Sequence, residues 1–326
     1  MSGELSIFNP FIHPDLVFYP VGGQGLSSGH LLPAMGHEIR LGAGAYTARM
    51  ASHLGMKIAL LDWVGDDLFG TFTADQLDKY GWLGDKVVRY HGGHMACMSV
   101  ADTESTGATM VASYPERWRR NLQDYSKMAD LVPLDSDLYV YSWLWSFAHP
   151  ALADQPTAQL VQNAVNRSQT VLLDPNWKPS GPPPAHELDQ LKIVLELIDV
   201  LLPNQRDAAM LVGQRPPADT VRALLDLGPR AVALTCGSQG VFVADHSGAE
   251  VLHVPPYPAE LKDTTGAGDY FGGAFAAAEG SLPERAALAN VAAVFGCQIP
   301  FDQVLPPVEQ FQQMAAELVA KTEVIL

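Results

Sequence analysis

The sequence predicts an α/β protein with a mostly parallel central sheet. Short apolar runs of strand length alternate with segments of helical period along most of the chain. This alternation is typical of parallel strands joined by right-handed crossovers. Polar residues, Gly or Pro flank the apolar runs, as expected for strands buried on both faces. The predicted strands are Leu5–Phe8, Ile58–Val64, Leu138–Ser142, Val171–Leu173, Val200–Leu202 and Ala231–Thr235.

Helices are predicted between several of these strands and near the C-terminal end. Gly228-Pro229 ends one of them, and the last carries apolar residues at helical spacing on a face expected to pack on the sheet. The predicted helices are Tyr46–Leu54, Pro156–Asn166, Leu188–Ile198, Thr220–Leu227 and Pro307–Thr322.

The stretch Val87–Ser113 differs from the rest of the chain because no helical segment interrupts it. Three short strand-like pieces, within 89–91, 95–100 and 109–113, are joined by turns that contain Gly or Asp. We expect this stretch to form a small antiparallel insertion, or lid.

Composition limits the classes of partner and the location. The 326 residues include 36 acidic and 20 basic side chains, which gives a formal net charge of −16. Nucleic acids and anionic membrane surfaces are bound through basic patches, so neither is an expected partner. No apolar run is long enough to span a bilayer, and the N-terminal segment lacks a signal-peptide pattern. Three cysteines without close, even spacing favour a reduced, cytoplasmic location.

The strongest chemical signal is the string Asp263–Asp269, which precedes a run of small apolar residues. The run predicts a buried helix, and the small residues before it expose backbone N–H groups at its N-terminus, where anions bind. Asp269 lies in the first helical turn, where a carboxylate can accept a proton from an attacking hydroxyl during phosphoryl transfer. In an alternative interpretation, Asp269 only complements the helix dipole and the glycines only form a tight turn.

The Asp263–Asp269 string and the helix after it resemble the C-terminal signature of the ribokinase-like (PfkB) family of carbohydrate and nucleoside kinases. Four further segments resemble motifs of that family in the same order, so the resemblance covers nearly the whole chain. They are the glycine-rich segment Gly42–Gly70, then Asp174–Lys178, Asn204–Asp207 and Thr235–Gly240.

The resemblance implies a ribokinase-like three-layer α/β/α domain with a mostly parallel central sheet and a small β lid. A single domain is expected over residues 1–326, with lid elements at about 16–40 and 87–113. The implied activity is transfer of the γ-phosphate of ATP to a primary hydroxyl of a sugar or sugar acid. Lids of this family often supply a dimer interface, so a homodimer through the lid is expected.

The resemblance also implies site residues. Asp269 is the expected catalytic base, and the amides of Gly266, Ala267 and Gly268 are the expected anion hole. The expected nucleotide contacts are Asn204, Thr235, Gly237, Gly240 and Asn290. The expected substrate contacts are Asp15, Gly42, Gly44, Tyr46, Asp174, Asn176 and Lys178.

ATP and Mg²⁺ are the implied cofactors, and Asp207 is expected to help organise Mg²⁺ through water. The family often binds a monovalent cation through backbone carbonyls, here expected near Asp263. After Arg230, only Lys262, Arg285 and Lys321 carry formal positive charge. The phosphates are therefore expected to be held by backbone amides, a helix N-terminus and Mg²⁺ rather than by basic side chains.

The chain departs from the family pattern mostly on the substrate side. Tyr46 stands where the family usually has Asn, Lys178 replaces Arg, and Asp207 replaces Glu. Two alternatives stay open for this reason. One is a nucleoside kinase on the same fold, in which Tyr46 and the tryptophans would contact a base. The other is a sugar- or nucleotide-binding protein without catalysis, although such a protein has no need of Asp269.

Two other nucleotide-binding patterns are not met. The glycines within 22–29 miss the dinucleotide fingerprint by one position, and no clear helix follows them. The Walker P-loop is absent from the sequence.

Overall fold

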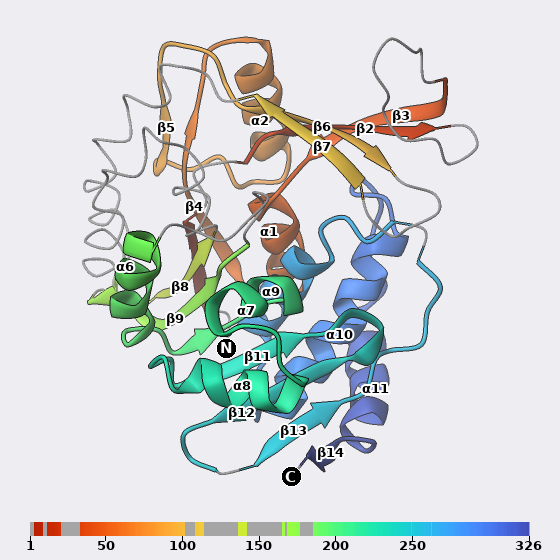
Figure 1. Cartoon of the computed structure of the whole chain (residues 1–326). Helices are drawn as coiled ribbons and strands as arrows, with labels where there is room; N and C mark the ends of the chain where they lie inside the picture. The colour runs from red at the N-terminus through yellow and green to blue at the C-terminus, as the bar shows by residue number, and fades with distance from the viewer. Residues whose placement is uncertain are drawn as a thin grey trace.

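A ten-stranded sheet runs through the part of the chain that the structure describes (Figure 1). The structure is a computed structural model, and it describes residues 3–8, 12–20, 33–101, 108–113, 136–141, 165–166, 168–176, 185–248, 250–261 and 263–325. The strand order in this sheet is β14-β13-β12-β11-β10-β9-β8-β1-β4-β5. Its strands are β1 Glu4–Phe8, β4 Lys57–Val64, β5 Val87–Arg89, β8 Ser136–Tyr141, β9 Ser168–Asp174, β10 Val200–Leu201, β11 Ala231–Thr235, β12 Val241–Asp245, β13 Val251–Val254 and β14 Glu323–Ile325.

Most of this sheet is parallel, which confirms the predicted fold class. All neighbouring pairs from β11 to β5 are parallel, whereas β11–β12, β12–β13 and β13–β14 are antiparallel. Each of the predicted strands overlaps a strand of the parallel part. The chain starts at β1, the third strand from one edge, adds β4 and β5 towards that edge, and then adds β8 to β11 on the other side. The strand order therefore reverses beside β1, which is where α/β sheets bind ligands.

Helices cover both faces of the sheet and complete three layers. One apolar core joins the sheet to α1, α2, α9, α10 and α11, and a second joins the other face to α6, α7 and α8. The predicted helices at 46–54, 188–198, 220–227 and 307–322 correspond to α1, α6, α8 and α11, and Pro156–Asn166 lies almost wholly outside the described residues. The bounds are α1 Gly44–His53, α2 Leu68–Lys79, α6 Ala185–Leu195, α7 Gln205–Val212, α8 Pro217–Leu225, α9 Ala267–Ala277, α10 Leu282–Gln298 and α11 Val308–Val319.

A second, four-stranded sheet lies at the top of the molecule in Figure 1, in the order β3-β2-β6-β7. Its strands are β2 Pro14–Pro20, β3 Ala34–Leu41, β6 Ala96–Ala101 and β7 Ala108–Ser113. All four strands lie within or overlap the two segments expected in the lid. The expectation that Val87–Arg89 belongs to the lid is wrong, because this segment forms β5, which pairs in parallel with β4 at the edge of the large sheet. Three residues carry too little alternation to show which sheet a strand joins.

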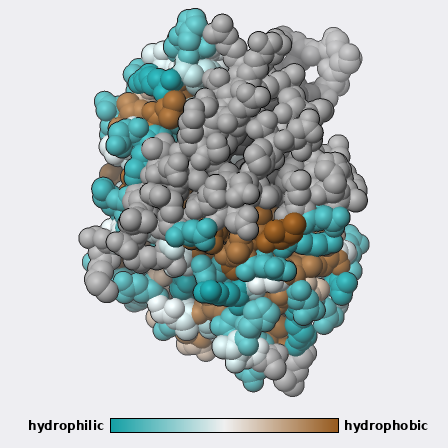
Figure 2. Space-filling model, turned by 90° about the vertical axis from the view of Figure 1, so that its left-hand side faces the viewer, coloured by the Kyte–Doolittle hydropathy of each residue, from teal (hydrophilic) through white to brown (hydrophobic). Residues whose placement is uncertain are grey.

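The described surface mixes polar and apolar residues. In Figure 2, hydrophilic residues dominate the described lower part of the face shown, and hydrophobic residues form smaller groups between them. Within the described ranges, no helix has the length and the apolar character needed to cross a bilayer.

Helices α1 and α9 pack closely enough to require a glycine between them. A Cβ atom added to Gly273 in α9 would lie 2.3 Å from the carbonyl oxygen of Thr47 in α1. Thr47 also donates a 2.9 Å hydrogen bond from its hydroxyl to the carbonyl oxygen of Asp269. This contact fixes the N-terminal half of α9 against α1.

We predict that Gly273→Ala lowers the free energy of unfolding by about 1–3 kcal/mol, because the added methyl group overpacks this contact. Gly84→Ala is the matched control, since a Cβ atom there would meet nothing within 4 Å. The control should change the same quantity by no more than about 0.5 kcal/mol. Urea denaturation of the two variants measures the difference, and equal losses would contradict the close packing.

Candidate active site

A cavity of about 840 Å³ lies where the chain leaves the carboxyl ends of the parallel strands. Asp15 lies on β2, the next strand after β1. Asp174 ends β9 with Asn176 two residues beyond it, Asn204 follows β10, and Thr235 ends β11. The cavity is therefore at the position that the strand order predicts for a ligand. Among the expected site residues, those that line it are Asp15, Gly42, Tyr46, Asp174, Asn176, Asn204, Thr235, Gly237, Gly240, Gly266, Ala267, Gly268, Asp269 and Asn290.

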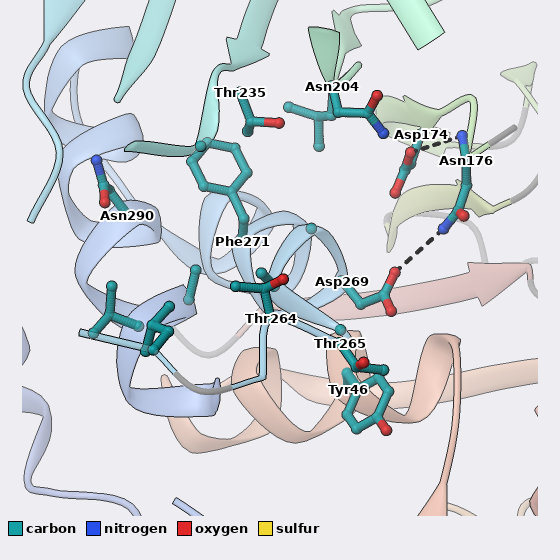
Figure 3. A pocket seen from close by; sticks show the side chains of 18 of the residues that line it. Tyr46, Asp174, Asn176, Asn204, Thr235, Thr264, Thr265, Asp269, Phe271 and Asn290 are labelled. Carbon is teal, nitrogen blue, oxygen red and sulfur yellow. Dashed lines mark hydrogen bonds between the residues drawn. The ribbon is translucent and has the colours of Figure 1, made fainter. Parts of the chain in front are cut away.

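The N-terminus of α9 forms one wall of this cavity. Gly266 precedes the helix with φ +80°, a left-handed conformation that favours glycine. A Cβ atom added there would lie 2.8 Å from the ring of Tyr46, so the loop backbone rests directly on that ring. In Figure 3, Tyr46 lies beside Thr265, and its hydroxyl points away from Asp269. Tyr46 is only 2% exposed, so the structure places it mainly as a support for the loop.

The backbone amides of the loop are not all equally available. The Ala267 N–H donates to the carbonyl oxygen of Thr264 at 3.0 Å, and the Thr265 N–H donates to a carboxylate oxygen of Asp263 at 2.8 Å. Gly268 lies in the first turn of α9, where N–H groups have no acceptor within the helix, and a Cβ atom there would meet nothing within 4 Å. An anion can therefore approach the backbone most closely at Gly268.

Asp269 follows in the same turn and lines the cavity. The Asn176 side-chain amide donates to its carboxylate at 3.3 Å (Figure 3). Burial away from water, together with the negative charge of Asp15, raises the pKa of the Asp269 carboxyl to about 8. A carboxyl group with a pKa near neutrality can exchange a proton with a ligand at physiological pH.

Asn176 is held in a strained conformation beside Asp269. Its φ is +44°, and its backbone N–H donates to a carboxylate oxygen of Asp174 at 3.0 Å. The Asn176 side chain is buried, and its Oδ1 has no hydrogen-bond partner in the structure. Strained residues of this kind gather at functional sites, and an acceptor without a donor fits a ligand hydroxyl.

The side of the cavity next to the small sheet is polar. Asp15, which is 2% exposed, accepts a 2.8 Å hydrogen bond from the hydroxyl of Ser99. A Cβ atom added to Gly42 would lie 3.0 Å from Nε2 of His13, so His13 packs against the backbone there. His13 also lines the cavity, although no sequence motif pointed to it. It directly precedes β2 and lies two residues before Asp15, and this proximity was the available signal.

At the opposite end of the cavity, Asn204 forms an isolated β-bridge with Thr235. Gly237 and Gly240 flank a short 3₁₀ helix, Gly237–Gln239, directly after Thr235. Phe271 lies below Thr235 in Figure 3 and also lines the cavity, which the sequence did not suggest.

Asn290 reaches the cavity, but its amide group is bonded to the backbone. Nδ2 donates to the carbonyl oxygen of Pro255 at 3.1 Å, and Oδ1 accepts from the Tyr257 N–H at 3.2 Å. Asn290 therefore holds a cavity-lining segment in place, and its expected contact with adenine stays a prediction.

Three expected residues are not brought to the cavity wall. Asp207 is fully buried, accepts from the Asn204 amide at 2.9 Å, and donates its own N–H to Asn204 Oδ1 at 2.9 Å. This is the helix-capping arrangement of α7, in which Asp207 positions Asn204, and its expected role in organising Mg²⁺ through water stays a prediction. Gly44 is buried at the start of α1, and Lys178 lies outside the described residues.

The sequence matches a known family of enzymes. The family model described as pfkB family carbohydrate kinase matches residues 29–303. The chain belongs to this family. By family, the protein is a kinase, and the sequence resemblance to ribokinase-like proteins is confirmed.

Individual pfkB relatives differ in the substrate that their names give. Ribokinase of Bacillus subtilis is 27% identical over 245 residues, which cover 73% of each chain. Cytidine kinase of Thermococcus kodakarensis is 37% identical over 89 residues, which cover 27% of this chain and 32% of that protein. The fold is shared with Ribokinase II of Escherichia coli, solved with ATP and Mg²⁺, at a TM-score of 0.71 and 18% identity over 98% of this chain and 100% of that chain.

The raised pKa of Asp269 predicts a pH-dependent stability. The folded state binds a proton at Asp269 up to about pH 8, whereas an unfolded Asp releases it near pH 4. The stability that this group contributes is therefore present below pH 4 and is lost as the pH rises towards 8. We predict that the melting temperature of Asp269→Asn, measured without ligands, rises relative to the wild type between pH 5 and pH 9. A difference that does not depend on pH would contradict the raised pKa.

Proposed function

We propose that the protein transfers the γ-phosphate of ATP to a primary hydroxyl of a sugar or sugar acid. The observation that carries this proposal is the position of Asp269, in the first turn of α9, beside the open amide of Gly268 and in contact with Asn176. One cavity thus offers a base and an anion-binding turn next to each other, as phosphoryl transfer requires.

Asp269 would accept the proton of the attacking hydroxyl as the O–P bond forms. The group must be ionised to do so, and its pKa of about 8 makes it a stronger base than an ordinary carboxylate once it is ionised. Asn176 donates to the carboxylate and would keep it directed towards the hydroxyl. Its buried, unpartnered Oδ1 is an acceptor for a second hydroxyl of the same substrate.

The opposite end of the cavity fits ATP. Backbone at Gly237 and Gly268 is open to close approach, because a Cβ atom at either position would meet nothing within 4 Å. Among the described residues, no three His, Cys, Asp or Glu side chains form a metal cluster. Mg²⁺ would therefore be held mainly by the phosphates and water, as is common for this ion, and would enter with ATP. The solved complex of Ribokinase II with ATP and Mg²⁺ supports these cofactors.

A sugar is favoured over a nucleoside by the polar side chains at the substrate end. His13, Asp15 and Asn176 are buried hydrogen-bonding groups around that end of the cavity, and the Bacillus subtilis relative is named a ribokinase. The match to a cytidine kinase supports the nucleoside alternative. Tyr46 gives that alternative little support, because its ring lies against Gly266, and Trp118, Trp143, Trp145 and Trp177 lie outside the described residues.

We predict that Asp269→Asn lowers kcat by several orders of magnitude and leaves ATP affinity near that of the wild type, because the base is lost while the amides remain. ADP release is measured with ribose, deoxyribose, sugar acids and nucleosides, and ATP affinity by thermal shift with Mg²⁺. Asp226→Asn on the exposed end of α8 is the matched control and should retain wild-type turnover.

The same panel separates the alternatives. Stimulation of ADP release by sugars alone supports the proposal, and stimulation by nucleosides alone supports a nucleoside kinase. Thermal shifts with no stimulated ADP release from any compound would identify a binding protein without catalysis. Wild-type turnover in Asp269→Asn would refute the role of the base.

We further propose that the chain forms one domain over 1–326, that it works in the cytoplasm, and that the small sheet is a lid that also joins two copies of the chain.

The small sheet has one buried and one exposed face. Ile39, Leu16, Met98 and Val111 lie directly opposite one another on its four strands, and Ile39 and Val111 are 50% and 53% exposed. An apolar row across an exposed sheet face is typical of a protein interface.

We predict a homodimer in solution that Val111→Glu converts to a monomer, because the new charge lies within the apolar row of this interface. Val324→Glu on β14 is the control, since Val324 is also an exposed strand valine but lies at the far edge of the large sheet. Light scattering coupled to gel filtration measures the mass of each variant. A monomeric wild type, or dissociation by both substitutions, would contradict the lid dimer.

A further inference from the structure

Two arginine side chains lie behind the wall of the cavity that carries the anion-binding turn. Arg49 comes from α1 and is 7% exposed, and Arg40 comes from the end of β3 in the small sheet. Neither lines the cavity, so neither is placed to contact a phosphate. Both instead contact the aromatic residues on which the turn rests.

Arg49 binds the carboxyl end of α10. Its guanidinium donates to the carbonyl oxygens of Pro300 and Gln303 at 2.8 Å each and to that of Ile299 at 3.3 Å. It also donates to the hydroxyl of Tyr270, the residue after Asp269, at 3.1 Å. These partners are carbonyl and hydroxyl oxygens, so the positive charge is balanced mainly by the negative end of the α10 dipole.

Arg40 binds the residue at which the turn begins. Its guanidinium lies 3.3 Å from a carboxylate oxygen of Asp263 and 2.8 Å from one of Glu38, and it stacks over the ring of Tyr46 at 5.6 Å. The other carboxylate oxygen of Asp263 accepts from the Thr265 N–H. Both oxygens of Asp263 are therefore occupied by groups of this chain.

These contacts leave little room for the monovalent cation that the sequence resemblance implied near Asp263. Such an ion needs several oxygen ligands and has to enter without its full hydration shell. Here the Asp263 carboxylate and three carbonyl oxygens after α10 already accept hydrogen bonds from Arg40 and Arg49. Two fixed positive charges nearby would also repel a further cation.

We propose that Arg40 and Arg49 are positioning residues that replace a monovalent cation behind the anion-binding turn, so that activity does not depend on potassium. Tyr46 and Tyr270 transmit their effect, since the two rings lie 4.9 Å apart and Tyr46 packs against Gly266. Arg40 and Asp263 also connect the small sheet to the turn, because Arg40 stands opposite Asp15 on β2. The orientation of the turn is thus coupled to the position of the sheet that carries Asp15.

The first test uses the wild-type protein in tetramethylammonium chloride, with part of the salt replaced by KCl, RbCl or NH₄Cl at constant ionic strength. We expect kcat/KM to change by less than about twofold, because the charge is already built in. The melting temperature should be equally insensitive to the cation. Saturable activation by potassium of about tenfold or more, or a rise in melting temperature specific to potassium, would overturn the proposal.

The second test removes each charge. Arg40→Ala exposes Asp263, and Arg49→Ala exposes the carbonyl oxygens after α10. Each variant should lose about tenfold or more in kcat/KM and regain part of it with KCl but not with tetramethylammonium chloride. Arg40→Lys and Arg49→Lys keep the charge and should retain more activity than the alanine variants without potassium. Loss of activity that neither lysine nor potassium restores would point to a purely structural role and overturn the proposal.

Arg215→Ala is the matched control for these variants. Arg215 also donates to a carbonyl oxygen at the end of a helix, that of Val212 in α7 at 2.8 Å, but it is exposed and does not line the cavity. It should keep wild-type activity without a response to potassium.

The activity measurements rest on the proposed kinase function, and the thermal measurements do not. If no compound in the panel is phosphorylated, the inference is still tested by melting temperature. Stabilisation of Arg40→Ala by potassium, with none for the wild type, supports it. Equal stabilisation of both proteins contradicts it, and this holds whether or not the proposed substrate class is correct.

Discussion

The contact between the Tyr46 ring and the backbone of Gly266 is the constraint on which the rest of the site depends. Gly266 has a left-handed backbone and no side chain, so α1 supports the turn from directly behind. About two helical turns further on, the close approach of Gly273 to Thr47 fixes the same two helices together. The direction of the α9 N-terminus, and with it the amide of Gly268 and the carboxyl of Asp269, therefore follows from helix packing rather than from the loop itself.

This packing buries the Asp269 carboxyl, which costs stability but makes the group a better base for the proposed reaction. A carboxyl group placed in the first turn of a buried helix loses water, and Asp15 adds like charge nearby, so the pKa of Asp269 rises to about 8. The same low dielectric strengthens hydrogen bonds to any charge that develops in the cavity. The positive φ of Asn176 is a second source of strain, and in this conformation its side-chain amide donates to Asp269. Stability is given up at the two residues nearest the proposed reaction.

The sequence was sufficient to predict the parallel sheet and a set of residues most of which line one cavity, for physical reasons. Runs such as Ala231–Thr235 are buried on both faces, so their local pattern is unambiguous, and the polar residue after each strand must lie at one edge of the sheet. The alanine-rich helix α10 was missed because it is apolar on several sides and shows little helical period. The sequence does not settle what Asp207 does, because a carboxylate three residues after an N-cap Asn can bond to that Asn as readily as it serves a metal. Which of the two it does depends on burial, a tertiary property.

The distribution of charge around the site also depends on tertiary structure and could not be predicted from the sequence. A chain with a net charge of −16 has few basic residues near the anion-binding turn in sequence, and this predicted that amides and Mg²⁺ would hold the phosphates. The turn itself fits that prediction, but in the part of the chain that the structure describes, two cations from elsewhere in the sequence, Arg40 and Arg49, pack behind it. Their guanidinium groups are directed at protein oxygens, so they set the field and the geometry behind the turn without binding the ligand. Burial reduces the screening that weakens surface charges, so two buried cations can act on the turn even in a chain as acidic as this one.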